Sequence, residues 1–199
     1  MDAREVFAEL VRPAHLWSQA EVLQRPCPVP SRPGLYGWYF KELPYPLATS
    51  QCATWGNLTL LYVGIAPKAP PGNGRPGSSQ TLRSRIRHHY RGNAAGSTLR
   101  LTLGCLLAER LGIQLRRVGS GNRLTFADGE HRLSAWMAEN AYVTWVELDR
   151  PWLVEGQLIT LLSVPLNLDQ NQQHGFHQQL TRLRREARAL ARASPIVST

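Results

Sequence analysis

The feature that most constrains this chain is a pair of apolar stretches, rich in aromatic and β-branched residues, that lie close together in the sequence. Residues 34–40 read GLYGWYF and residues 58–66 read LTLLYVGIA. Aromatic and β-branched residues favour strands, and turn-forming residues precede the first stretch. We therefore expect two strands that pair antiparallel through the connection 41–57.

The residues after the second stretch change character twice. Residues 66–80 are rich in Pro, Gly and Ser, a composition that predicts a loop rather than a helix or a strand. Residues 81–90 then place Leu82 and Ile86 one helical turn apart, which predicts a helix. Three arginines share another face of this predicted helix: Arg83, Arg87 and Arg91.

The rest of the chain alternates helical and strand patterns without an internal repeat. Residues 1–24 predict one or two helices broken near Pro13. Helical periodicity predicts four further helices: 97–111, 128–140, 152–162 and 177–192. The apolar pattern also predicts a strand at 143–148 and a hairpin formed by 113–117 and 123–127.

The distribution of charge indicates a polyanionic partner. The formal net charge is +9, and no acidic residue lies between Glu42 and Glu109. Within that segment lie the following cationic side chains: Lys68, Arg75, Arg83, Arg85, Arg87, Arg91 and Arg100. Arginine binds phosphate through a planar two-pronged fork, so the segment favours a polyanion such as nucleic acid as a partner, and we expect binding to DNA that depends strongly on salt. A merely solvated basic face is the alternative that charge alone leaves open.

Membrane and secreted proteins are disfavoured by the composition. No apolar run reaches the roughly 18–20 residues that a membrane span requires, and the charged residues within 1–10 argue against a secretory signal peptide. Cys27, Cys52 and Cys105 are widely spaced and form no C-x-x-C pair, which predicts reduced thiols rather than a zinc site or disulfides. We therefore expect a cytoplasmic protein with no membrane partner.

Two glycine–tyrosine triplets and a helix follow one another in a familiar order. Residues 34–36 (Gly-Leu-Tyr) and 62–64 (Tyr-Val-Gly) are similar to the pair of triplets that names the GIY-YIG nucleases. The predicted helix LRSRIRHHY resembles the arginine-bearing helix of that family, with Arg85 as the central arginine and His89 one turn later. Each triplet alone is common in strands, and the order of the elements gives the resemblance its specificity.

Two polar residues farther along complete the resemblance. Glu155, a lone acid on a predicted apolar helix, is similar to the metal-binding glutamate of the family, and Asn167 is similar to the asparagine that follows it. The resemblance covers roughly 34–92 and 150–170. With its long separation between Arg85 and Glu155, this chain is closest in layout to the restriction-endonuclease-like members of the family.

The resemblance implies an α/β fold in which a small, mainly antiparallel sheet is flanked by helices. It divides the chain into an N-terminal helical extension over 1–33 and a nuclease domain over 34–192. Residues 93–149 depart from the minimal family pattern, and we expect them to form an inserted helix–hairpin–helix region. The implied activity is metal-dependent endonucleolytic hydrolysis of DNA phosphodiester bonds that leaves 5′-phosphate and 3′-hydroxyl ends.

The chemistry of the matched side chains is consistent with this activity. Phosphodiester hydrolysis needs an activated water, charge stabilisation at the phosphate and help for the leaving oxygen. Arg85 can stabilise the phosphate, and the resemblance implies one Mg²⁺ or Mn²⁺ ion per active site at Glu155, since such hard cations need few carboxylates. We expect Tyr36 to act as general base with His89 as its partner, and Tyr62 to position water or phosphate, although these three roles can be exchanged.

Asn167 is the sixth candidate catalytic residue, with a simple role in a turn as the alternative. Candidate DNA-binding residues lie on the predicted helix and in the loop before it: Arg83, Arg87, Arg91, Lys68 and Arg75. A second arginine stripe lies on the last predicted helix: Arg184, Arg188 and Arg192. That stripe can be a solvated face or a contact with the DNA backbone.

Three other functions stay open on the sequence alone. The chain could be a non-catalytic nucleic-acid-binding module, or an RNase or structure-specific repair nuclease with the same fold. It could also be a partner-binding protein that uses residues 93–149. Cleavage of both strands of a duplex would need two active sites, which predicts either a homodimer or two successive nicks.

Overall fold

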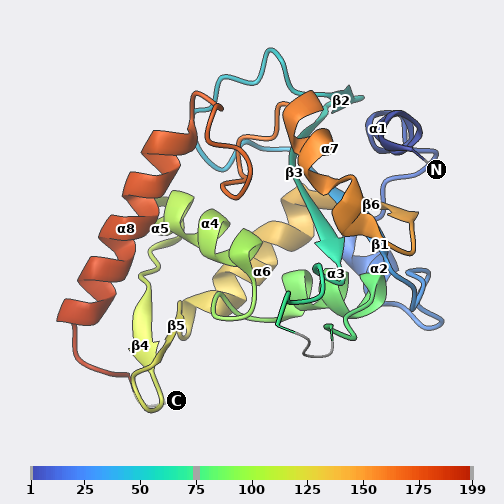
Figure 1. The fold of residues 1–199 in the computed structure, drawn as a ribbon. Helices are drawn as coiled ribbons and strands as arrows, with labels where there is room; N and C mark the ends of the chain where they lie inside the picture. Colours follow the sequence, from blue (N-terminus) through green and yellow to red (C-terminus); the bar gives the residue numbers. More distant parts are fainter. Residues whose placement is uncertain (1, 74–76, 198–199) are drawn as a thin grey trace.

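A four-stranded antiparallel sheet lies at the centre of the computed structural model, which describes residues 2–73 and 77–197 (Figure 1). The strands follow the order β2-β3-β1-β6. They span these residues: β1 Gly34–Phe40, β2 Thr54–Trp55, β3 Leu58–Ala66 and β6 Ala141–Glu147. The expected antiparallel pairing of β1 with β3 is confirmed. The short strand β2 was not predicted and lies in the connection between them.

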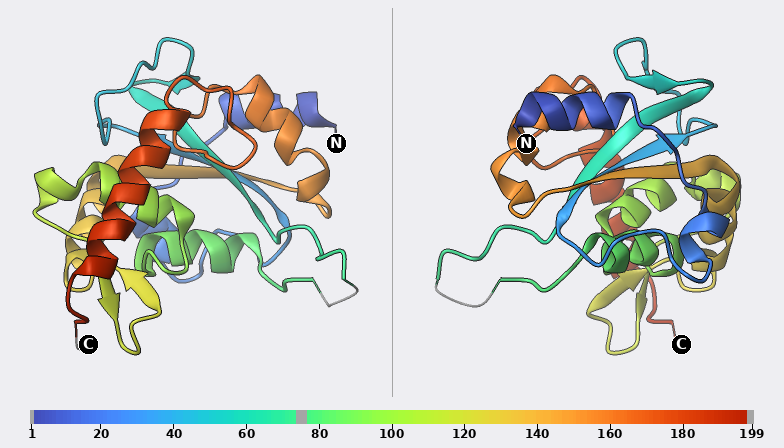
Figure 2. Two further views of the ribbon diagram at one scale, coloured as in Figure 1. Left: turned by 60° about the vertical axis from the view of Figure 1, so that its left-hand side comes forward. Right: turned by 90° about the vertical axis from the view of Figure 1, so that its right-hand side faces the viewer.

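Helices cover both faces of this sheet (Figure 2). Their bounds are α1 Ala3–Val11, α2 Gln19–Leu23, α3 Leu82–Arg91, α4 Thr98–Leu106, α5 Ala108–Leu111, α6 Gly129–Asn140, α7 Glu155–Leu161 and α8 His177–Ala193. Helices α1 and α7 share a hydrophobic cluster with Leu35 and Tyr39 of β1. Helices α2, α3, α4 and α6 pack with Tyr36, Trp38 and Phe40 on the other face. The predicted α/β fold, a mainly antiparallel sheet flanked by helices, is confirmed.

The segment 93–149 contributes both to the sheet and to the packing beside it. Strand β6 lies within this segment and pairs with β1 along its whole length. Strands β4 (Arg116–Val118) and β5 (Arg123–Thr125) form a separate antiparallel pair, and α8 packs against α4 and β4. That 93–149 is an insertion stays a prediction, but β6 is a strand of the central sheet.

Two predicted helices are divided in the structure. The helix expected over 97–111 consists of α4 and α5, because Leu107, with φ −94° and ψ 4°, leaves the helical conformation to bury its side chain. The helix expected over 152–162 begins as a 3₁₀ turn, Pro151–Leu153, and α7 starts only at Glu155. Glu155 is therefore the first residue of α7 and not an interior one.

The N-terminal segment forms two short helices, as predicted, with the break around Pro13. Each begins with a capping box, at Asp2 for α1 and at Ser18 for α2, which supplies acceptors to otherwise free backbone N–H groups. Helix α1 buries Val6 and Leu10 against the sheet. Within the described part of the chain, none of the helices combines the length and the hydrophobicity that crossing a bilayer requires.

Candidate active site

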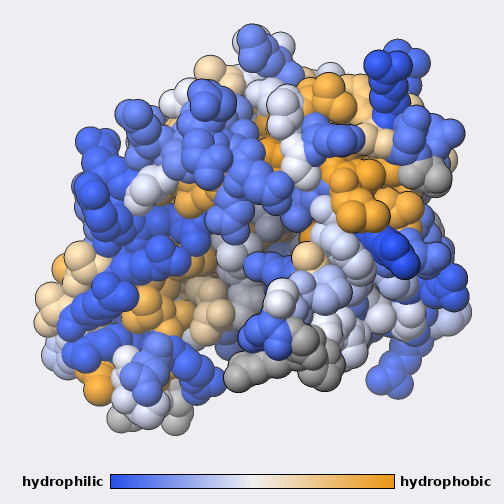
Figure 3. All heavy atoms as spheres, in the orientation of Figure 1, coloured by the Kyte–Doolittle hydropathy of each residue, from blue (hydrophilic) through white to orange (hydrophobic). Residues whose placement is uncertain are grey.

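Five of the six candidate catalytic residues line one cavity of about 410 Å³. They come from five different segments: Tyr36 of β1, Tyr62 of β3, Arg85 of α3, Glu155 of α7 and Asn167 after α7. The sixth, His89 of α3, is fully buried and contacts Tyr36. In the space-filling view, a hollow lies near the centre of the face that carries α8, beside the hydrophilic side chains over that helix (Figure 3). The fold thus gathers residues that lie far apart in the sequence.

The antiparallel register of β1 and β3 places both tyrosines on the same face of the sheet. Tyr36 pairs with Gly64, and Tyr62 pairs with Trp38, so the two phenols occupy diagonal positions on that face. A Cβ atom built at position 64 would lie 2.5 Å from the Tyr36 hydroxyl oxygen. Only a glycine at this position therefore leaves room for the Tyr36 ring.

Tyr36, His89 and Ser97 form a chain of buried hydrogen bonds. The Tyr36 hydroxyl lies 2.9 Å from His89 Nε2, and His89 Nδ1 lies 2.7 Å from Ser97 Oγ. Burial, and then the nearby charge of Arg85, lowers the pKa of His89 well below its usual value of 6.5. Burial likewise raises the pKa of the Tyr36 phenol. At neutral pH the chain therefore consists of an uncharged phenol, an uncharged imidazole and a hydroxyl.

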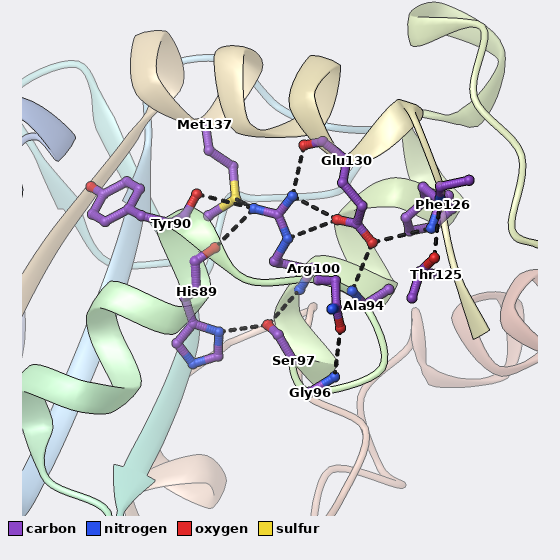
Figure 4. Close-up of polar contacts among 12 residues, drawn as sticks. His89, Tyr90, Ala94, Gly96, Ser97, Arg100, Thr125, Phe126, Glu130 and Met137 are labelled. Atoms are coloured by element: carbon purple, nitrogen blue, oxygen red, sulfur yellow. Dashed lines mark hydrogen bonds and ion pairs between the residues drawn. The ribbon is translucent and has the colours of Figure 1, made fainter. Parts of the chain in front are cut away.

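An ion pair between Arg100 and Glu130 supports the backbone that carries His89 (Figure 4). The Arg100 guanidinium donates to the Glu130 carboxylate from Nε at 3.0 Å and from Nη2 at 2.6 Å. Its Nη1 donates to the backbone carbonyl oxygens of His89 and Tyr90, at 3.1 and 3.2 Å. Because Arg100 belongs to α4, this pair fastens the end of α3, which carries His89, to the start of α4, which begins after Ser97.

Arg85 and Tyr62 face the cavity with few protein partners. Arg85 Nη1 donates to the Gly96 carbonyl oxygen at 2.8 Å. The Tyr62 hydroxyl lies 3.2 Å from Thr98 Oγ1, and burial raises the pKa of this phenol. In the described residues, no carboxylate lies within ion-pairing distance of Arg85, so most of its N–H groups are available to a ligand.

The acidic side of the cavity is formed by α7 and the segment after it. Glu155 Oε2 accepts a long hydrogen bond of 3.4 Å from Gln170 Nε2. Burial is the main cause that raises the pKa of Glu155; the charge of Asp169 adds to it, and Lys68 opposes it. Asp169 lines the same cavity. No cluster of three or more His, Cys, Asp or Glu side chains suited to a metal is present in the described residues.

Asn167 joins its segment to the backbone of β3. Its Oδ1 accepts from the Val63 N–H at 3.0 Å, and its Nδ2 donates to the Val63 carbonyl oxygen at 2.8 Å. The neighbouring Leu166 N–H donates to Leu61 at 3.0 Å. This side chain therefore mimics a paired strand and positions β3, which carries Tyr62. A direct catalytic role for Asn167 stays a prediction.

The candidate DNA-binding residues differ in their surroundings. Lys68 is exposed and lines the cavity, whereas Arg83 donates from Nε to a backbone carbonyl of the connector before β1 at 2.6 Å. Arg87 is half-buried and Arg91 exposed, and neither lines the cavity. Arg75 lies outside the described residues. Contact between these residues and DNA stays a prediction.

Arg184, which belongs to the second predicted arginine stripe, lines the cavity as well. Three other residues at the site were not among the candidates: Ser97, Thr98 and Asp169. Two of them carried a usable signal. Ser97 opens a predicted helix, where a serine side chain commonly caps, and it does cap α4. Asp169 follows Asn167 by two residues, in a segment already matched to the family. For Thr98, no pattern in the sequence indicated that it would face Tyr62.

A family model described as "GIY-YIG catalytic domain" matches residues 34–186. The match covers most of the chain and reaches from Tyr36 to Arg184, both of which line the cavity. This match identifies a nuclease domain that acts on nucleic acid. The chain belongs to the GIY-YIG family. Among curated proteins and solved structures, no match to this chain was found.

Proposed function

We propose that the protein is a metal-dependent endonuclease that hydrolyses DNA phosphodiester bonds and leaves 5′-phosphate and 3′-hydroxyl ends. The observation that carries this proposal is that Arg85 and Glu155 line one cavity without forming an ion pair, in the part of the chain that the structure describes. Opposite charges held apart in a cavity can each bind a ligand group of the other sign. A phosphate and a divalent cation are such a pair.

The acidic side of the cavity fits one divalent cation. Burial has raised the pKa of Glu155, so a bound cation would offset the cost of keeping this carboxylate charged. Glu155 would hold Mg²⁺ or Mn²⁺, with Asp169 lining the same cavity, and water and phosphate oxygens would complete the coordination. When bound, the ion would stabilise negative charge on the phosphate and on the leaving oxygen.

Tyr36 and His89 are arranged to carry a proton away from the attacking water. As the Tyr36 oxygen takes the proton from water, the phenol can pass its own proton to His89 Nε2 across the 2.9 Å hydrogen bond. In that tautomer His89 Nδ1–H donates to Ser97 Oγ. This relay avoids a free phenolate, which the raised pKa of Tyr36 disfavours. The water oxygen then bonds to phosphorus while the bond to the 3′ oxygen breaks, and the 3′ oxygen takes a proton from solvent water to become the 3′-hydroxyl.

Arg85 and Tyr62 are placed to hold the phosphate for this attack. The free N–H groups of Arg85 can donate to two phosphate oxygens and stabilise the charge that develops there. Tyr62, tethered to Thr98, can donate a further hydrogen bond to the phosphate or orient the water.

Plasmid nicking tests the proposal most simply. We expect the protein to nick supercoiled DNA with Mg²⁺, and Glu155→Gln to lower the rate by about a hundredfold or more. Glu139→Gln serves as the matched control, because Glu139 is an exposed acid of α6 and does not line the cavity. Equal nicking by all three proteins would refute the site.

The products and the substrate can be tested with the same preparation. A DNA ligase reseals a nick only where a 3′-hydroxyl meets a 5′-phosphate, so resealing would support the proposed end chemistry. Parallel reactions with duplex, single-stranded and flapped DNA and with RNA would separate a DNA endonuclease from an RNase or a repair nuclease. Sedimentation with and without duplex would show whether the enzyme is a homodimer or nicks as a monomer.

A further inference from the structure

Arg184 of α8 is buried and nearly without partners. It is 8% exposed, and its only hydrogen bond within the described residues runs from Nη1 to Thr102 Oγ1, at 3.4 Å. Its Nε is buried with no acceptor. A buried guanidinium normally pairs with a carboxylate, because an unpaired buried charge is costly. Asp169 lines the same cavity and its charge acts on Arg184, but it forms no ion pair with Arg184 within the described residues. The unpaired Nε of this buried guanidinium therefore suits an anionic ligand.

The position of Arg184 shows where such an anion would lie. Arg184 lines the catalytic cavity and also a second cavity of about 410 Å³. The two cavities share five lining residues: Ile65, Lys68, Arg85, Thr98 and Arg184. They are therefore adjoining parts of one groove, which runs between α3 and α8.

The two parts of the groove differ in charge. The catalytic cavity contains both cations and carboxylates, Glu155 and Asp169 among them. The described residues that line the second cavity include four cations but no acid: Lys68, Arg85, Arg184 and Arg188. Ser78, Ser97 and Thr98 line it as well. A lining that is rich in guanidinium groups and contains no carboxylate suits a phosphate group that carries no metal ion.

We propose that Arg184 and Arg188 bind the nucleic-acid phosphate next to the scissile one, in the second cavity. The inference rests on the proposed function, since it takes the scissile phosphate to lie between Arg85 and Glu155. It assigns different roles to arginines of a single helix stripe, because Arg192 is exposed and lines neither cavity. In this arrangement Arg184 helps to hold the strand, and Arg85 acts on the reacting phosphate.

Binding of a fluorescent DNA duplex, followed by anisotropy in EDTA over a range of salt concentrations, tests this assignment without cleavage. We compare the double variant Arg184→Met/Arg188→Met with the control Arg185→Met/Arg192→Met. The control removes the same charge from exposed positions of the same helix, outside both cavities. Methionine keeps the apolar stem, and thermal unfolding of each variant checks that it folds.

We expect the double variant in the groove to bind about tenfold to a hundredfold more weakly than the wild type. The magnitude of the slope of log K against log salt should fall by about 1, because the two arginines bind one phosphate. The control should change affinity less than about threefold. Arg184→Lys/Arg188→Lys should recover part of the slope, since lysine restores the charge without the fork.

Equal losses in the two double variants would overturn the assignment, because they would indicate only a general attraction to a basic helix. An unchanged affinity would overturn it as well. In cleavage assays, the groove variant should raise KM and leave kcat nearly unchanged; a lower kcat at constant KM would instead place Arg184 on the scissile phosphate. A wild-type protein that binds DNA without nicking it would refute the proposed function, and the anisotropy comparison would still decide the inference.

Discussion

Two arginines in this molecule are buried to a similar degree and yet have opposite surroundings. Arg100 is 0% exposed and Arg184 is 8% exposed. Every N–H direction of Arg100 meets an acceptor, on Glu130 or on the end of α3. Within the described residues, Arg184 has one long hydrogen bond, to a threonine, and its Nε has no acceptor. Burial alone therefore does not distinguish a charged side chain that stabilises the fold from one that binds a ligand.

The comparison extends to the regions around these arginines. The Arg100–Glu130 network behind His89 forms its hydrogen bonds within the protein itself. These hydrogen bonds therefore contribute to the free energy of folding. In the described residues, the cations and carboxylates of the groove do not form ion pairs with one another. They can therefore contribute to the free energy of ligand binding. Substitutions in the first region should change stability, and substitutions in the second should change binding and cleavage.

Arg100→Met gives the largest expected effect on stability. It removes the Arg100 donors from Glu130 Oε2 and from three backbone carbonyls, those of His89, Tyr90 and Glu130, and breaking a buried pair in this way costs about 3–5 kcal/mol. Urea unfolding followed by circular dichroism measures the loss. Arg132→Met is a suitable control, because Arg132 is exposed and donates only to two carbonyl oxygens near the end of α5. If Arg100→Met were as stable as this control, the network would not hold the site.

His89→Gln should leave most of the fold intact and lower cleavage by about a hundredfold, or about 2.7 kcal/mol, because the relay from Tyr36 loses its acceptor. The wild-type rate should be flat near neutral pH. It should fall as the pH drops through the pKa of His89, which burial places below 6.5, since protonated imidazole cannot accept a proton. A rate that rises in proportion to hydroxide from pH 6 to about 9 would contradict the relay.

Asn167→Leu should lower both stability and cleavage, each to an intermediate degree. It removes both hydrogen bonds to Val63 and leaves a buried N–H and carbonyl unpaired, at a cost of about 1–3 kcal/mol. We expect a loss of stability and a fall in cleavage caused by displacement of β3. Hydrogen exchange should show faster exchange of the Val63 amide. Full stability with abolished cleavage would instead favour a direct catalytic role for Asn167.

Arg184→Met should have the smallest effect on the free protein. Because the guanidinium is buried without a carboxylate partner, removing its charge should change the free energy of unfolding by less than about 1 kcal/mol, or even increase stability. Thermal unfolding of the variant beside Arg100→Met gives the comparison directly. A loss as large as that of Arg100→Met would mean that Arg184 is a structural residue.

The sequence predicted the elements of the site better than it predicted their contacts. Tyr36 and Tyr62 follow from strand pattern and motif, because antiparallel pairing of two neighbouring stretches leaves few registers. Arg85 and His89 follow from the resemblance of their helix to the arginine-bearing helix of the family. The role of Glu130 did not follow, since its pairing with Arg100 joins α4 to α6 across a separation that no local pattern encodes.

Arg184 illustrates the same limit. On the sequence it belongs to a stripe with Arg188 and Arg192, and one stripe suggests one role. The packing of α8 on α4 divides the stripe, because it buries Arg184 beside Thr102 and leaves Arg192 exposed. Such a difference depends on how a helix is rotated and placed, which the periodicity of a single helix does not determine.

Arg85→Met, measured for cleavage and for unfolding on the same preparation, tests the central claim most directly. Within the described residues Arg85 donates to one backbone carbonyl, that of Gly96, and hydrogen-bonds to the Tyr36 phenol, so we predict that the substitution changes the free energy of unfolding by less than about 1 kcal/mol. Cleavage of DNA with Mg²⁺ should fall by about a thousandfold, because the phosphate loses its main donor. A variant that cleaves like the wild type, or that loses activity only because it unfolds, would contradict the account.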